Sequence, residues 1–191
     1  MADSVTAQDK GTGFTPHDEG QFAAVCADVV DLGQRLEQFA GKLPRLAPKC
    51  ALVFVTNSPG ETKDVSAEVT VSMGEKATLR GLLESWRGKG YTPEQVAAGI
   101  PLDKLVGHPA LLSIEHKRSG KGNVYAKIRA ISPLPKEMLT TAPAVTGYVR
   151  GEWWAGRKKA YAEEAAKFLQ TVAKNDELVQ PVEDDDDALP F

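Results

Sequence analysis

The stretch Leu79–Gly88 (LRGLLESWRG) decides how we interpret the fold, because it is a strongly patterned helix set between strand-like segments. Its large apolar side chains repeat at helical spacing and form one stripe, made of Leu79, Leu82, Leu83 and Trp86. Gly88 follows at the position where a helix commonly ends in the left-handed conformation. The stripe predicts that Trp86 belongs to the hydrophobic core.

Three strands are predicted before this helix. Residues 49–57 (KCALVFVTN) form a β-branched apolar run that stops at a turn signal. Residues 65–73 (VSAEVTVSM) alternate between apolar and polar side chains and should pair with that run. Residues 21–32 (QFAAVCADVVDL) favour a first strand, which could be bulged; a helix is the alternative, because alanine is frequent there. We interpret residues 33–48, with their glycines and prolines, as a long connecting loop.

A short helix and two more strands follow the central helix. Thr92 as the N-cap, Pro93 in the first turn and Gln95 predict a helix start with a capping box. Residues 109–117 and 123–131 predict strands joined by a basic, glycine-rich hairpin turn. The order strand, strand, strand, helix, strand, strand is that of the five-stranded OB barrel. We therefore expect a mainly β protein with an OB-fold domain over residues 21–135, the helix plugging the barrel between the third and fourth strands.

The other segments are predicted to be appendages of this domain. Residues 1–20 should form a mobile arm, and residues 136–152 a linker over the surface. Residues 153–175 predict a helix, because apolar side chains repeat at helical spacing: Tyr161, Ala165, Phe168, Leu169 and Val172. That helix could dock on the barrel or on a second subunit, so a homo-oligomer is left open. Residues 176–191 should be a disordered acidic tail.

The charge of the chain is unevenly distributed. The formal net charge is −3, from 23 basic and 26 acidic residues. Seven of the acidic residues and no lysine or arginine lie in residues 176–191, so residues 1–175 hold 19 acidic against 23 basic residues, a net charge of +4. A basic body with an acidic tail suits a protein that binds nucleic acid and recruits partners through a separate arm.

The cysteines and the N-terminus indicate the compartment. Cys26 and Cys50 lie in apolar stretches without metal-ligand spacing, so we interpret them as small buried side chains in a reducing compartment. The N-terminal residues lack the pattern of a signal peptide, and no apolar run reaches membrane-spanning length. We expect a soluble protein in the cytoplasm of a bacterial host cell, without a membrane partner.

The last nine residues, Glu183–Phe191 (EDDDDALPF), predict a segment that a partner protein binds. A dense run of carboxylates repels itself and cannot fold alone. A partner with an apolar socket ringed by lysine or arginine could capture the end of such a chain. The residues assigned to partner binding are Asp184, Asp185, Asp186, Asp187, Leu189, Pro190 and Phe191. A simple solubilising terminus is the alternative.

Two parts of the sequence resemble known families. The tail is similar to the C-terminal peptide of bacterial single-stranded DNA-binding proteins, with Leu189 where a β-branched residue is common. The strings LESWRGK, GHPALLSIEHK and GKGNVYAKIRAISPLP resemble phage and prophage OB-fold single-stranded DNA-binding proteins, over residues 21–135. The resemblance implies sequence-tolerant binding of single-stranded DNA in phage replication, recombination or repair. It also implies that the tail recruits replication and recombination proteins.

A groove for single-stranded DNA needs cations for the phosphates and flat side chains for the bases. On the last strand, Tyr125, Lys127 and Arg129 should share the solvent face, while Val124, Ala126, Ile128 and Ala130 point inward. The hairpin extends this basic surface, and two aromatic positions lie elsewhere in the chain. The full set of expected DNA-binding residues is Phe54, His116, Lys117, Arg118, Lys121, Tyr125, Lys127, Arg129, Trp153 and Arg157. For Phe54 the pattern does not say which face is inside, and at least one of Trp153 and Trp154 should be in the core.

Two alternatives to DNA binding remain. The first is an OB-fold adaptor that binds no DNA and whose tail mimics that of a host single-stranded DNA-binding protein. The second is a metal-dependent nuclease, with a site assembled from Asp28, Asp31, Glu115 and His116. The sequence contains no Walker-type loop, HExxH, CxxC or G-x-S-x-G motif. We therefore expect a protein without catalytic activity, cofactor or metal.

Overall fold

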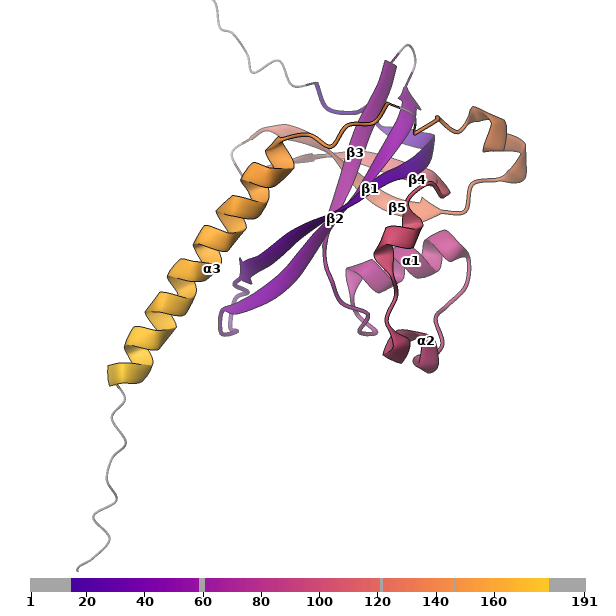
Figure 1. Cartoon of the computed structure of the whole chain (residues 1–191). Coiled ribbons are helices and arrows are strands. Elements are labelled where there is room, and N and C mark those ends of the chain that lie inside the picture. The colour runs from indigo at the N-terminus through magenta and orange to yellow at the C-terminus, as the bar shows by residue number, and fades with distance from the viewer. Residues whose placement is uncertain (1–14, 59–60, 121, 146, 179–191) are drawn as a thin grey trace, which may run out of the picture.

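The structure is a computed structural model that describes residues 15–58, 61–120, 122–145 and 147–178. These residues form a mainly β protein with a long C-terminal helix (Figure 1). The elements in chain order are β1 (Gly20–Glu37), β2 (Arg45–Ser58), β3 (Glu61–Thr70), α1 (Thr78–Arg87), α2 (Pro93–Ala98), the 3-10 helix η1 (Leu102–Leu105), β4 (Pro109–Arg118), β5 (Val124–Ser132), the 3-10 helix η2 (Lys136–Thr141) and α3 (Trp153–Leu178). The predicted order of strands and helices is confirmed.

The five strands make one antiparallel sheet in the order β3-β2-β1-β4-β5. β1 lies at the centre, paired with β2 along most of its length and with β4 through its first residues, 20–25. β3 and β5 are the two edge strands. Among the described residues no backbone pairing joins β3 to β5, so the hydrogen-bonded sheet is open.

The prediction of a long loop over residues 33–48 is wrong. β1 continues to Glu37 and β2 begins at Arg45, so the two strands form a long hairpin arm (Figure 1). Gly33 does not end β1, because its positive φ of 73° is accommodated at a shift in the register between the strands. Pro48 is tolerated within β2 because its backbone polar groups face the side of β3 and not that of β1: its carbonyl accepts a hydrogen bond from Val71 N, just past the end of β3. Its missing N–H therefore removes no bond to β1.

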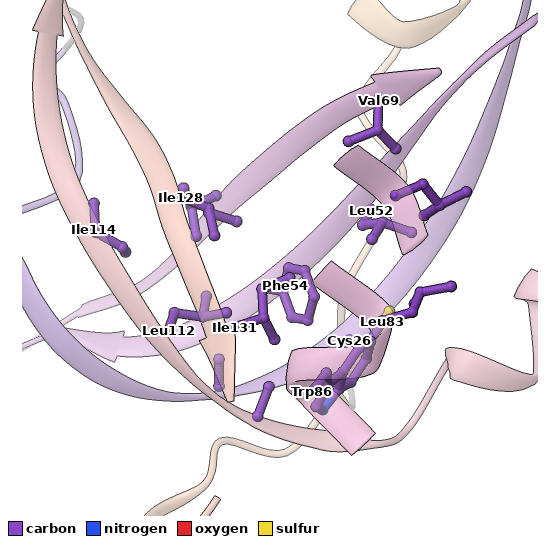
Figure 2. Close-up of a cluster of buried hydrophobic side chains, with 14 of the residues drawn as sticks. Cys26, Leu52, Phe54, Val69, Leu83, Trp86, Leu112, Ile114, Ile128 and Ile131 are labelled. Carbon is purple, nitrogen blue, oxygen red and sulfur yellow. The ribbon is translucent and has the colours of Figure 1, made fainter. Parts of the chain in front are cut away.

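The main core lies between the sheet and α1 (Figure 2). Leu79, Leu83 and Trp86 of α1 are buried there, as the sequence predicts. The Trp86 ring meets the edge of Phe54 at a centroid distance of 5.3 Å, and Trp86 Nε1 donates to the carbonyl of Pro109 at 2.8 Å. Gly88 ends α1 with φ 69°. The predicted capping box of α2 is also present.

A second apolar layer lies on the opposite face of β1 and β2, under α3. Trp154 and Tyr161 of α3 pack against four strand residues, Val30, Leu32, Ala51 and Val53. The expected helix is confirmed, and it docks on the sheet of its own chain. Its contact ends early: Ala165 is buried, whereas Leu169 and Val172 of the predicted stripe are exposed. Because α1 and α3 cover opposite faces, β2 is buried on both sides.

The segment before α3 is more structured than a linker. It contains η2, and Tyr148 packs against the layer under α3. Arg150 makes two hydrogen bonds to the Asp28 carboxylate, both at 2.6 Å. This ion pair and that of Lys158 with Asp31, at 2.6 Å, fix the start of α3 on β1.

Both cysteines are free and buried, which confirms their interpretation as small apolar side chains. Burial raises the pKa of the Cys26 thiol to about 12 and that of Cys50 to about 11. Both side chains therefore stay in the neutral thiol form, which is the unreactive one. No helix in the described part of the chain is both long and apolar enough to cross a membrane.

Glu37 in the hairpin arm should make the folded protein less stable at acid pH. Hydrogen bonds from Lys49 first, and then from Arg45 and Thr70, lower the pKa of Glu37 from 4.5 to about 2. The folded pKa lies below the unfolded one, so this contribution is complete above pH 4.5 and is lost as the pH falls toward 2. We expect the free energy of unfolding of the wild type to fall by about 2 kcal/mol more than that of Glu37→Gln over this range. Urea denaturation of both proteins at several pH values measures this difference.

The control for this comparison is Glu152→Gln, which changes an exposed glutamate outside the arm. Its pH dependence should follow that of the wild type. If the free energy of unfolding of Glu37→Gln changed with pH as much as that of the wild type, Glu37 would not be the cause of the loss of stability at acid pH.

Candidate nucleic-acid interface

A cleft of about 880 Å³ lies between the two edge strands. β3 supplies one wall and β5 the other, while α1 and the first turn of α3 contribute the remaining sides. The lining consists of residues 64–69 and 125–129, with His17, Thr78, Leu82, Trp153, Trp154 and Arg157. Five of the expected DNA-binding residues therefore share one cleft: Tyr125, Lys127, Arg129, Trp153 and Arg157.

The β5 wall carries the predicted row of exposed side chains. Tyr125 is 42% exposed, Lys127 and Arg129 are exposed, and Ile128 is buried between them. The predicted alternation ends at Arg129, because Ser113 of β4 pairs with Ala130 while Ile114 pairs with Ile128. Arg129 is thus the extra residue of a bulge. As a consequence Ala130, predicted to point inward, is exposed, and Ile131 is buried instead. Val124, also predicted inside, is exposed as well.

The hairpin residues lie outside the cleft. His116, Lys117 and Arg118 are exposed at the end of β4, and Lys121 lies outside the described residues. His116 is tied to the segment before β1, since its Nε2 donates to the carbonyl of His17 at 2.8 Å. Lys117 pairs with Glu115 at 3.2 Å. The structure therefore divides the expected site into a cleft group and a hairpin group.

The expectation that Phe54 contacts DNA is wrong. Its side chain is fully buried in the core, against Trp86 and beneath α1 (Figure 2). The sequence could not place it, because both faces of β2 are covered and both are apolar. Phe54 is a structural residue.

Of the two adjacent tryptophans at the start of α3, one is buried and the other is exposed, as the sequence predicts. Trp154 is 3% exposed and belongs to the layer under α3, whereas Trp153 is 51% exposed. Their rings stack with centroids 3.6 Å apart and planes inclined by 27°. Gly151 permits this arrangement, because a Cβ there would lie 2.6 Å from the Trp153 ring. One flat aromatic face is thus held in the cleft that β5 also lines.

Arg157 lies in a cluster that sequence reasoning missed. It contacts the Glu68 carboxylate of β3 through Nε at 2.8 Å and through a terminal nitrogen at 2.7 Å. The same carboxylate accepts from Arg35 at 3.2 Å and from the Tyr161 hydroxyl at 2.5 Å. Burial by itself raises the pKa of Glu68, but the hydrogen bonds from Tyr161 and Arg157 outweigh it, so the net pKa is lowered. Nothing in the sequence marks Glu68 beyond its place in an alternating strand.

His17 is a second residue that the sequence did not mark. Its side chain is buried, its Nε2 forms a hydrogen bond with Thr56 Oγ1, and its ring meets Phe22 edge-on at 4.5 Å. It closes one side of the cleft. A histidine beside a proline in a polar segment gives no signal of such burial.

No family model, curated protein or solved structure matches the chain. The site must therefore be interpreted from its own geometry.

The residues of the nuclease alternative do not form a metal site. Within the described ranges, no three histidine, cysteine, aspartate or glutamate side chains lie close enough to hold a metal ion together. Asp28 and Asp31 are instead paired with Arg150 and Lys158 of the segment that anchors α3. Their carboxylates help to dock the helix.

The charge of the cleft is mixed. Lys127, Arg129 and Arg157 are its cations, and Asp64 and Glu68 are its carboxylates. The positive excess is therefore small, and the cations are concentrated on β5 and α3. The partner-binding residues Asp184, Asp185, Asp186, Asp187, Leu189, Pro190 and Phe191 lie outside the described residues.

Proposed function

We propose that the protein binds single-stranded DNA of any sequence, without catalysis or cofactor, in phage DNA replication, recombination or repair. The observation that carries the proposal is the row Tyr125, Lys127 and Arg129 on β5. It lies in the same cleft as the exposed Trp153 and as Arg157. Aromatic faces and cations along one groove are what sequence-tolerant binding of a single strand requires. The proposed place of action is the cytoplasm of a bacterial host cell.

We also propose that β1 to β5 form a barrel of the OB type. The sheet order and the position of α1 between β3 and β4 support this assignment. In such barrels the strand faces and their connecting loops bind oligonucleotides. The residues proposed to bind DNA here are the row on β5 and the side chains on β3 and α3 that share its cleft.

The physical basis of binding is the same for every sequence. Lysine and arginine side chains neutralise phosphates and release condensed counterions, which makes the affinity depend on salt. Every base has a π face, so a base stacked on an aromatic side chain contributes about 1–3 kcal/mol without selecting a sequence. Tyr125 and Trp153 supply two such faces in one cleft.

The acidic tail is the second part of the proposal. Its likeness to the tails of bacterial single-stranded DNA-binding proteins supports a role in recruiting replication and recombination proteins. The acidic tail and the cations of the cleft, Lys127, Arg129 and Arg157, belong to different parts of the chain. One part would hold the strand while the other captures a partner.

A titration of fluorescently labelled poly-dT at several salt concentrations tests DNA binding. If about five phosphates are neutralised, log affinity against log salt concentration should slope at roughly −3.5. A duplex of the same length is the control and should bind more weakly, because its bases cannot stack on the cleft. Absence of poly-dT binding at every salt concentration would contradict the proposal and favour the adaptor.

A further inference from the structure

Two arginines converge on one carboxylate at the rim of the cleft. Arg35 comes from the β1 half of the hairpin arm and Arg157 from α3, and both contact Glu68 on β3. Both guanidinium groups also lie over the ring of Tyr161, at 5.2 and 5.7 Å from its centroid. Three elements that are distant in sequence are thus joined at Glu68.

The Glu68 carboxylate lies between two guanidinium groups, those of Arg35 and Arg157. Guanidinium groups bind carboxylates and phosphates through the same donors and the same planar geometry. Arg35 and Arg157 are each 45% exposed at the side chain, so each also faces solvent. Arg157 and Glu68 line the cleft, which places this carboxylate within reach of a strand bound there.

We propose that Glu68 is a built-in competitor of the DNA backbone, which holds Arg35 and Arg157 in place and limits how tightly Arg157 binds a phosphate. The inference rests on the proposed function and names a regulating residue of the same cleft. A phosphate that reaches Arg157 shares its donors with Glu68 and is repelled by the carboxylate. Glu68 therefore keeps the arginines ordered in the free protein and weakens the complex.

The test is the affinity of Glu68→Gln for poly-dT. The amide keeps the size of the side chain and an oxygen that accepts from Tyr161, but it removes the charge that competes with a phosphate. We expect binding to tighten about tenfold, as one additional charge-assisted contact would give. The slope of log affinity against log salt should steepen by about 0.7, for one more neutralised phosphate.

Asp31→Asn is the matched control. It also removes one carboxylate that pairs with a cation of α3, Lys158, and it changes the net charge equally. Asp31 does not line the cleft. We expect this control to change the affinity by about twofold or less, because Arg150 and Asp28 still hold the start of α3 on β1 and the remaining difference is the overall charge. Adding Arg157→Gln to Glu68→Gln should return the affinity to the wild-type value or below.

Glu68→Asp is the second variant, in case Glu68→Gln does not fold. It keeps the charge, but its carboxylate ends one methylene short and loses at least one guanidinium, so binding should tighten about two- to threefold. Thermal unfolding of each variant shows whether the comparison is between folded proteins. If the wild type binds and neither Glu68 variant binds more tightly than Asp31→Asn, the inference is wrong and the proposed function stands. If neither the wild type nor any Glu68 variant binds, both the inference and the proposed function are wrong.

Discussion

The combined replacement Tyr125→Ala, Lys127→Gln and Arg129→Gln should weaken binding to poly-dT by about a hundredfold or more. Loss of one stacked base costs about 1–3 kcal/mol, and two phosphate contacts are removed with it. The three side chains are exposed on one wall of the cleft, so the fold should tolerate the change. Fluorescence titration at two salt concentrations measures the loss.

The salt dependence separates the roles of these residues. Lys127→Gln with Arg129→Gln should reduce the slope of log affinity against log salt by about 1.4, for two phosphates, whereas Tyr125→Ala alone should leave the slope unchanged. Lys104→Gln with Lys136→Gln is the matched control, because both lysines are exposed and neither lines the cleft. An equal loss of affinity in the control would mean that net charge, and not the β5 row, binds the strand.

Phe54→Ala should lower the free energy of unfolding by about 3–5 kcal/mol, the usual cost of removing a fully buried aromatic ring. Phe54 is fully buried, and the substitution also removes its edge contact with Trp86. Urea denaturation followed by circular dichroism measures the change. Phe39→Ala is the matched control: the same substitution at the tip of the hairpin arm, where the ring is half-exposed, should cost about 1 kcal/mol or less.

The same position tests the correction to the binding site. Phe54→Leu keeps an apolar side chain in the core and should leave the affinity for poly-dT within about twofold of the wild type. A tenfold loss of affinity in a stably folded Phe54→Leu protein would show that the ring reaches the strand.

The local patterns of the sequence predicted most of the elements. The stripe of α1, the capping box at Thr92 and the turn-bounded strands each depend on residues close together in the chain, which is the range over which such patterns are informative. The exposed row on β5 was predicted for the same reason. Its end at the bulge of Arg129 was not, because the bulge is set by the pairing with β4.

The failures share one cause, which is contact between distant segments. Gly33 and Pro48 look like loop residues until the pairing of β1 with β2 and the end of β3 are known. Phe54 could not be assigned a face because α1 covers one side of β2 and α3 the other. The cluster at Glu68 joins residues 33 and 89 positions away, Arg35 and Arg157, so no sequence motif could contain it.

The double burial of β2 has a consequence for shortened forms of the chain. Residues 50–56 (CALVFVT) are an uncharged, β-branched run without proline, the composition of segments that aggregate when uncovered. α3 shields one side of that run through Ala51 and Val53. A fragment that ends before Trp153 would present both side chains to solvent, together with Val30 and Leu32. We therefore expect such a fragment to self-associate more readily than a chain that contains α3, which also lines the cleft.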